Sequence, residues 1–245
     1  MKISLALSGG AARGAFHLGV LHALEENMIE PIAISGSSIG AIIATSYAAG
    51  VSPLDQLDIF KSKAFKKAFK FNFFKQGILQ IDRQQKILKE LVPIDDISET
   101  NITLNITTID LNSGNIIRFE KGDAVTLCIA SASVAPLFHP ISYGEYQLVD
   151  GGIMDNLPVE PLKKAGFPIF GVDLHPDQKG FKNTIGGIVK RTIFLMWRAS
   201  VQAQKKECDL YITHPDLSKY SLFRFNNLQE MFDLGYERAL LLTDY

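Results

Sequence analysis

Residues 3–50 have the sequence ISLALSGGAARGAFHLGVLHALEENMIEPIAISGSSIGAIIATSYAAG, and this stretch decides the fold. Two short apolar runs, at 3–7 and 32–35, predict strands that are covered on both faces. Each run leads through glycines into a helical pattern, the first over 14–28 and the second over 39–49. Two successive strand–turn–helix units predict an α/β fold, in which helices cover both faces of a parallel sheet.

The second turn, Gly36-Ser37-Ser38-Ile39-Gly40, matches the G-x-S-x-G pattern of a nucleophile elbow. Such an elbow is a strained turn that exposes one serine hydroxyl at the carboxyl end of a sheet, and glycines flank it because larger side chains would collide. The register selects Ser38 rather than its neighbours Ser35 and Ser37. A plain glycine–serine turn is the alternative, and the position between a strand and a helix favours the catalytic interpretation.

The first turn, Ser8-Gly9-Gly10-Ala11-Ala12-Arg13-Gly14, is a glycine-rich loop whose backbone N–H groups can hold a negative charge. A dinucleotide-binding loop competes with this interpretation. That loop requires glycine where Ala11 stands and an acidic residue after the second strand, where Ser35 stands. A Walker loop is excluded because the chain has no Gly-Lys-Ser/Thr here. We therefore expect an oxyanion hole with N–H donors from Gly10, Ala11 and Ile39.

A serine nucleophile requires a base to take its proton. In the chain order of an α/β-hydrolase, His175 or His214 would be that base. That topology needs several strands before the elbow, and the 35 residues present there hold only one strand and one helix. Asp150 is the alternative base, because it follows a strand predicted at 146–149. An ordinary Asp-Gly turn explains the same residues, so the spacing leaves both interpretations of Asp150 open.

The composition is that of an ordinary globular protein: 245 residues, 47% hydrophobic, 21% charged, with a net charge of −1. This charge speaks against nucleic acid as a partner. Cys128 and Cys208 have no C-x-x-C spacing, and no residues have the spacing of metal ligands, so we expect no metal and no other cofactor. Because no signal peptide is evident and cysteines are few, we expect a cytoplasmic location.

Residues 31–54 carry no charge and are long enough to span a bilayer. Three glycines and several serines arranged as a turn interrupt this stretch before Val51. A buried strand, the elbow and a buried helix therefore explain it better than a membrane span does.

The rest of the chain continues the alternation of strands and helices. Strands are expected at 102–109, 116–119, 168–174 and 210–213, and helices at 82–91, 123–132, 157–165, 184–206 and 228–242. No linker or repeat divides the chain, so we expect one domain over residues 1–245. Residues 60–91 begin with mixed lysines and phenylalanines. They form either a cap over the active site, which we favour, or a surface that contacts anionic lipid.

Four blocks, taken in order, resemble the patatin-like phospholipases: the loop at 9–14, the elbow at 36–40, the segment 130–138, and Val149-Asp150-Gly151-Gly152. The resemblance implies a three-layer α/β/α sandwich with a central, mostly parallel sheet. It implies that the catalytic dyad is Ser38 and Asp150, that Gly9, Gly10, Ala11, Arg13, Gly14 and Ile39 surround the oxyanion hole, and that Gly36, Gly40, Gly151 and Gly152 are motif glycines. The family has glycine where this chain has Ala11, and alanine fits there if its φ is negative.

The resemblance also implies the substrate and the reaction. The substrate is a lipid acyl ester, a phospholipid or lysophospholipid, cleaved through an acyl-enzyme intermediate. If the lysines and phenylalanines that begin the segment 60–91 face lipid, they add peripheral contact at the inner membrane surface. The alternatives are an acyltransferase or thioesterase on the same dyad, and a lipid-binding regulator without turnover. Aspartate ordinarily titrates near ~3.9 and histidine near ~6.5. A Ser–Asp dyad therefore predicts activity that persists to mildly acid pH.

Overall fold

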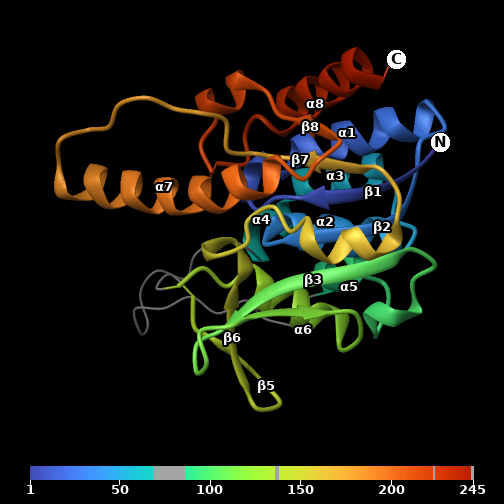
Figure 1. The fold of residues 1–245 in the computed structure, drawn as a ribbon, viewed down its shortest axis with the longest axis horizontal. Coiled ribbons are helices and arrows are strands. Elements are labelled where there is room, and N and C mark those ends of the chain that lie inside the picture. Colours follow the sequence, from blue (N-terminus) through green and yellow to red (C-terminus); the bar gives the residue numbers. More distant parts are fainter. Residues whose placement is uncertain (69–85, 136–137, 223, 244–245) are drawn as a thin grey trace.

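The computed structural model describes residues 1–68, 86–135, 138–222 and 224–243. Its strands form one sheet in the order β5-β6-β3-β2-β1-β7-β8, and β4 also pairs with β3 (Figure 1). The pairs that join β3, β2, β1, β7 and β8 are parallel, and those that involve β4, β5 or β6 are antiparallel. The predicted α/β class with a mostly parallel central sheet is confirmed.

The element bounds follow the sequence patterns closely. The strands are β1 (Lys2–Leu7), β2 (Glu30–Ser37), β3 (Thr103–Asp110), β4 (Ile116–Phe119), β5 (Ile141–Tyr143), β6 (Tyr146–Asp150), β7 (Ile169–Val172) and β8 (Leu210–Ile212). The α-helices are α1 (Ala15–Glu26), α2 (Ile39–Ala48), α3 (Pro53–Lys61), α4 (Lys63–Ala68), α5 (Lys86–Leu91), α6 (Ala124–Ser131), α7 (Ile185–Lys205) and α8 (Leu228–Thr243). The 3-10 helices that matter for the site are η1 (Ala11–Gly14), η3 (Gly151–Ile153) and η4 (Glu160–Ala165).

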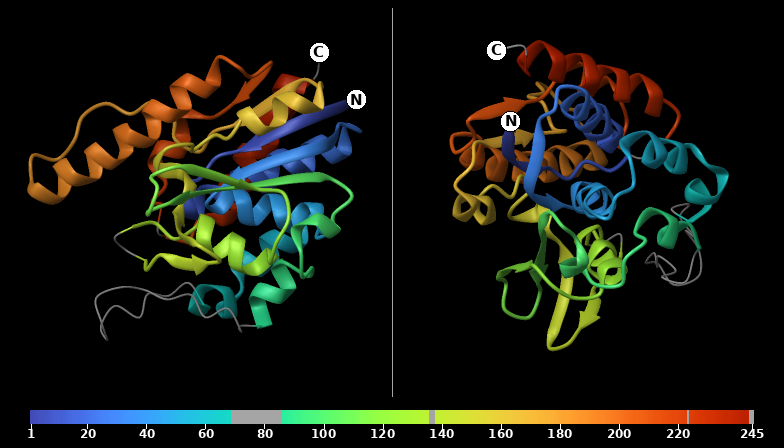
Figure 2. Two further views of the ribbon diagram at one scale, coloured as in Figure 1. Left: turned by 60° about the horizontal axis from the view of Figure 1, so that its bottom comes forward. Right: turned by 90° about the vertical axis from the view of Figure 1, so that its right-hand side faces the viewer.

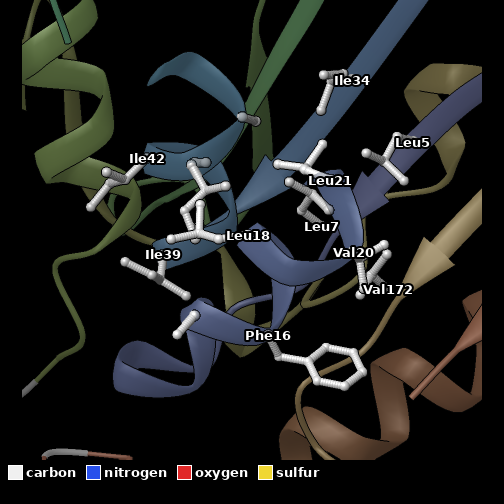
Figure 3. Packing of buried hydrophobic residues seen from close by; sticks show 14 of the residues in the cluster. Leu5, Leu7, Phe16, Leu18, Val20, Leu21, Ile34, Ile39, Ile42 and Val172 are labelled. Atoms are coloured by element: carbon white, nitrogen blue, oxygen red, sulfur yellow. The ribbon is translucent and has the colours of Figure 1, made fainter. Parts of the chain in front are cut away.

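Apolar side chains form two clusters around this sheet. The larger one joins β1, β2 and β3 to α1, α2, α6 and α8, and Figure 3 shows Leu7, Leu21 and Ile42 among its members. The smaller one joins β1, β2 and β7 to the η4 region and to Val201 of α7. Because a β-strand turns alternate side chains to opposite faces, β1 contributes Leu5 to the larger cluster and Ala6 to the smaller one. The chain therefore has three layers, with the sheet in the middle (Figure 2).

Two local predictions differ from the structure. Residues 157–165 were expected to be helical, and the helix found there is a 3-10 helix over Glu160–Ala165. Pro161 lacks the backbone N–H group that an α-helix over this range would bond to the carbonyl of Leu157. Strand β5 was not predicted, because three half-exposed residues at the edge of a sheet give no clear periodicity.

The segment from 60 to 91 is described only in part, because residues 69–85 lie outside the described residues. Phe60 and Phe65 are fully buried and stack on each other, with ring centroids 4.6 Å apart. Phe65 also meets Phe225 edge-on. These two phenylalanines therefore belong to the protein core and not to a lipid-facing surface. None of the described helices is long and apolar enough to cross a membrane.

Candidate active site

Ser38 occupies a strained turn between β2 and α2. Its φ is 55° and its ψ is −125°, a conformation that a residue with a side chain rarely adopts. Glycine is required on both sides: a Cβ at Gly36 would lie 2.5 Å from the Ala41 nitrogen, and one at Gly40 would collide with the Leu7 carbonyl. Ser35 and Ser37 are fully buried, whereas Ser38 is partly exposed. The predicted register of the elbow is therefore present.

Asp150 reaches Ser38 across strand β3. Strand β2 pairs with β3 at Ser37 and Thr107, and β6 pairs with β3 at Asp150 and Thr108. Ser38 and Asp150 therefore lie at neighbouring positions, on either side of β3, at the edge of the sheet where β2 ends. The sequence placed each residue at a strand end, and the strand order brings them together.

The end of α6 holds both residues in place. The Ser38 N–H donates to Ser131 Oγ over 2.9 Å, and Ser131 Oγ in turn donates to the Thr107 carbonyl over 2.7 Å. Two residues further along, the Ser133 carbonyl accepts the Asp150 N–H over 3.0 Å. Sequence reasoning assigned no role to these two serines, although both lie in the 130–138 block.

The Asp150 carboxylate is buried and only half satisfied. Its Oδ1 accepts the Gly152 N–H over 2.7 Å, whereas Oδ2 has no hydrogen-bond partner in the described part of the chain. The Ser38 hydroxyl lies near enough to lower the pKa of Asp150, but it does not complete a hydrogen bond to Oδ2. Catalytic hydrogen bonds are often long before substrate binds. Gly151 lets the chain turn here, since a Cβ at that position would collide with the Thr107 carbonyl.

Burial raises the pKa of Asp150 from 3.8 to about 6, because removal from water penalises the charged carboxylate. The nearby Ser38 hydroxyl and the Gly152 N–H lower this pKa, but by less than burial raises it. The expectation of an ordinary aspartate that stays ionised in mild acid is therefore wrong. A carboxylate with this pKa is a stronger base at neutral pH than an exposed one.

The glycine-rich loop leaves some of its N–H groups free and uses others. The Gly9 N–H donates to the Asn156 carbonyl and the Arg13 N–H to the Gly10 carbonyl, so these two amides are occupied. The N–H groups of Gly10, Ala11 and Ile39 donate to no backbone group among the described residues. Of the residues predicted around the oxyanion hole, these three keep an available donor. Gly14 has a packing role, because a Cβ there would lie 2.6 Å from Ile39 Cγ1.

Ala11 adopts the left-handed conformation, with a φ of 48°. The condition set from the sequence, a negative φ at this alanine, is therefore not met. The Cβ of an L-residue crowds the neighbouring carbonyl in this conformation, at a cost of about 1 kcal/mol. The loop keeps the backbone path that glycine would take, and the strain is held locally.

Arg13 braces the loop. Its guanidinium donates to the Leu174 carbonyl over 3.0 Å and to the Tyr220 carbonyl over 2.8 Å. Burial lowers its pKa to about 10, so it still carries its charge at neutral pH. Of the two roles weighed from the sequence, bracing of the loop is the one that these contacts serve.

The histidines that could replace Asp150 are engaged elsewhere. His175 is buried, with Nδ1 3.3 Å from the Asn156 amide nitrogen, and burial lowers its pKa to about 3. His214 accepts the Asp216 N–H at its own Nδ1, at the start of a 3-10 helix. His17 contacts the Ser8 carbonyl over 2.8 Å, and burial lowers its pKa to about 4. None of these contacts involves Ser38.

Asn156, to which sequence reasoning assigned no role, links the parts of the site. Its side-chain oxygen would lie 2.6 Å from a Cβ at Gly9 and 2.6 Å from a Cβ at Gly152, so it fills the space between the loop and the dyad. Its N–H donates to Ser200 Oγ over 3.2 Å. Asn156 therefore connects the glycine loop, the turn after Asp150 and helix α7.

Among the described residues, no group of three or more His, Cys, Asp or Glu side chains is arranged to hold a metal ion. The chemistry available at this site is that of a hydroxyl, a carboxylate and backbone amides.

Comparisons with known proteins show what this chain is similar to. A family model described as patatin-like phospholipase matches residues 5–163. An uncharacterized NTE family protein of Mycobacterium tuberculosis is 30% identical over 168 residues, which cover 66% of this chain and 45% of that protein. Lysophospholipase NTE1 of Candida albicans is 23% identical over 270 residues, which cover 97% of this chain and 20% of that protein. This chain spans less than half the length of these two relatives.

One solved structure supports the fold. The crystal structure of VipD from Legionella pneumophila matches 99% of this chain and 66% of its own, with a TM-score of 0.56 and 14% sequence identity. At this identity the likeness concerns the arrangement of helices and strands.

Proposed function

Because this chain belongs to the patatin-like phospholipase family, we propose that it cleaves lipid acyl esters, with Ser38 as nucleophile and Asp150 as its base. The observation that carries the proposal is the free, buried oxygen Oδ2 of Asp150, which lies beside the only serine of the elbow that is not buried. A buried acceptor without a partner is costly, so it is best explained by a proton that it takes up during the reaction.

The reaction follows from the placement of these groups. Asp150 accepts the hydroxyl proton of Ser38 as Oγ attacks the ester carbonyl carbon, and the carbonyl oxygen becomes an oxyanion. The free N–H groups of Gly10, Ala11 and Ile39 stabilise this oxyanion, each by about 3 kcal/mol. The proton on Asp150 then passes to the departing alcohol, which leaves an acyl-enzyme.

The second half of the reaction repeats these steps with water. Asp150 takes a proton from a water molecule as the water oxygen attacks the acyl carbon. Asp150 then gives that proton to Ser38 Oγ as the fatty acid leaves. The same dyad could pass the acyl group to an alcohol or amine instead, and analysis of the products distinguishes transfer from hydrolysis.

We propose phospholipids or lysophospholipids as substrates. The support is the family and the name lysophospholipase carried by relatives from Candida albicans and other fungi. The cytoplasmic location inferred from the sequence remains a prediction.

A fluorophosphonate probe tests the proposal. The wild-type protein should be labelled, Ser38→Ala should not, and Asp150→Asn should react at least ~100-fold more slowly because the base is lost. Ser37→Ala is the matched control: the hydroxyl is buried one residue away, has no partner in the described part of the chain, and its loss should leave labelling intact. Unlabelled, folded wild-type protein would favour a lipid-binding regulator without turnover.

A further inference from the structure

Helix α7 stands away from the body of the protein for much of its length (Figures 1 and 2). In its 21 residues only Arg198 and Val201 are buried. A helix that packs on one edge of a domain normally buries one face along its whole length. Among the described residues, none in the first half of α7 is buried.

An apolar stripe runs along the exposed side of α7 from Ile185 to Met196. We call it the α7 stripe, and it consists of Ile185, Ile188, Val189, Leu195 and Met196, whose exposed fractions are 84%, 47%, 52%, 49% and 49%. Ile188 and Val189 follow Ile185 by three and four residues, and Leu195 and Met196 follow that pair by seven residues, so the five side chains share one face of a helix. The usual arrangement is therefore inverted, with large apolar side chains in water.

The charge around the stripe has one sign. Residues 178–206 contain no acidic residue and seven basic ones: Lys179, Lys182, Lys190, Arg191, Arg198, Lys205 and Lys206. Only one of them, Arg198, makes ion pairs among the described residues, with Asp173 and Asp177. The chain as a whole has a net charge of −1, so α7 is a local basic region on a nearly neutral protein.

The base of α7 is attached to the active site. Ser200 accepts the Asn156 N–H, and the Trp197 ring lies 5.1 Å from the His175 ring, measured between centroids. From there the helix extends beyond the edge of the sheet to which β1 points, where Ser38 and Asp150 lie (Figure 1). The first half of α7, which carries most of the α7 stripe, therefore lies beyond the catalytic edge (Figure 1).

We propose that the α7 stripe docks on an anionic lipid bilayer and holds the catalytic edge against it, which rests on the lipid-ester function proposed above. Apolar side chains enter the acyl boundary, while lysines and Arg191 meet the anionic headgroups. A second copy of this chain fits the stripe less well, because it would bring an equally basic helix against this one.

Vesicle cosedimentation tests the proposal. The wild-type protein should bind vesicles of phosphatidylcholine with phosphatidylglycerol, and should bind pure phosphatidylcholine more weakly. The double variant Ile188→Ser with Leu195→Ser should lose about tenfold or more in affinity. The matched control, Leu54→Ser with Leu241→Ser, removes two exposed leucines, 47% and 67% exposed, from α3 and α8 and should bind as the wild type does. Far-UV circular dichroism establishes that each variant is folded.

Two further measurements separate the possible outcomes. Lys182→Gln with Lys190→Gln should weaken binding to the anionic vesicles, and added salt should do the same. Unchanged binding in the serine double variant overturns the proposal. So does a wild-type dimer in sedimentation velocity that this variant converts to monomer. Hydrolysis of a soluble p-nitrophenyl ester should persist in all variants. A wild-type protein that cleaves neither this ester nor phospholipid refutes the proposed catalytic function, and the vesicle-binding result is then judged separately.

Discussion

Replacement of Asp150 by asparagine should abolish activity and make the protein more stable at neutral pH. Asparagine keeps an oxygen for the Gly152 N–H, nearly the same volume, and no charge. In the folded protein the pKa of this carboxyl is about 6, against 3.8 for the exposed carboxyl of the unfolded chain. A difference of about two pKa units corresponds to about 3 kcal/mol between the two protonation states.

The sign follows from proton linkage. Because the pKa of Asp150 is higher in the folded state, the carboxyl contributes its stability below pH ~3.8, and that stability is lost as the pH rises through about 6. Asp150→Asn removes this loss. Its free energy of unfolding should exceed that of the wild type by about 3 kcal/mol at pH 8, and by about 0.5 kcal/mol at pH 4.

Urea denaturation at a series of pH values measures this difference. Asp58→Asn, an exposed aspartate on α3, controls for the loss of one negative charge and should show no such trend. Parallel stability curves for Asp150→Asn and the wild type would refute the reasoning, because they would mean that folding does not raise the pKa of Asp150. A less stable variant at pH 8 would refute it more strongly, since the buried charge would then be favourable.

Three further predictions concern the same site. The kcat/KM of the wild type should fall about tenfold per pH unit below pH ~6, as Asp150 becomes protonated. His175→Gln should show the same fall, since the pKa of His175 is about 3; a kcat/KM that no longer falls in this variant would mean that the histidine acts as the base. Ala11→Gly should raise the free energy of unfolding by about 1 kcal/mol and retain activity, and a destabilised variant would mean that φ at this residue is not strained. Ser131→Ala should lower kcat and cost about 1–3 kcal/mol of stability, because the buried Ser38 N–H and Thr107 carbonyl lose their shared partner. Ser142→Ala, at an exposed serine, is the control, and equal kcat values in the two variants would mean that Ser131 does not position Ser38.

The pKa of Asp150 is a property that the sequence does not predict. A reference pKa assigned to Asp150 predicts activity well below pH 6, and a histidine base would give a limb near 6. In the structure the aspartate titrates where a histidine usually does, and His175 titrates far below. Only substitution of the two residues in turn distinguishes a dyad from a triad here.

The sequence by itself determined most of the secondary structure and the position of the nucleophile. Hydrophobic periodicity and the two glycine turns predicted most of the helices and strands, but not α3 and α4. The G-x-S-x-G pattern identified Ser38, because such patterns depend on steric limits among neighbouring residues. The four-block order of the family then selected Asp150 over the histidines. The short edge strand β5 and the 3-10 form of η4 escaped, since neither leaves a strong periodic signal.

Contacts between distant residues decided the rest. The neighbourhood of β2, β3 and β6 places Asp150 beside Ser38, and burial there raises the pKa of that carboxyl. Pairing with Asn156 and Gly10 removes the Gly9 and Arg13 amides from the set of free donors. The packing of the whole loop fixes φ at Ala11, and no neighbour within the described ranges of the chain covers the α7 stripe. Burial, strain and electrostatics are properties of a packed environment, and a linear pattern does not contain them.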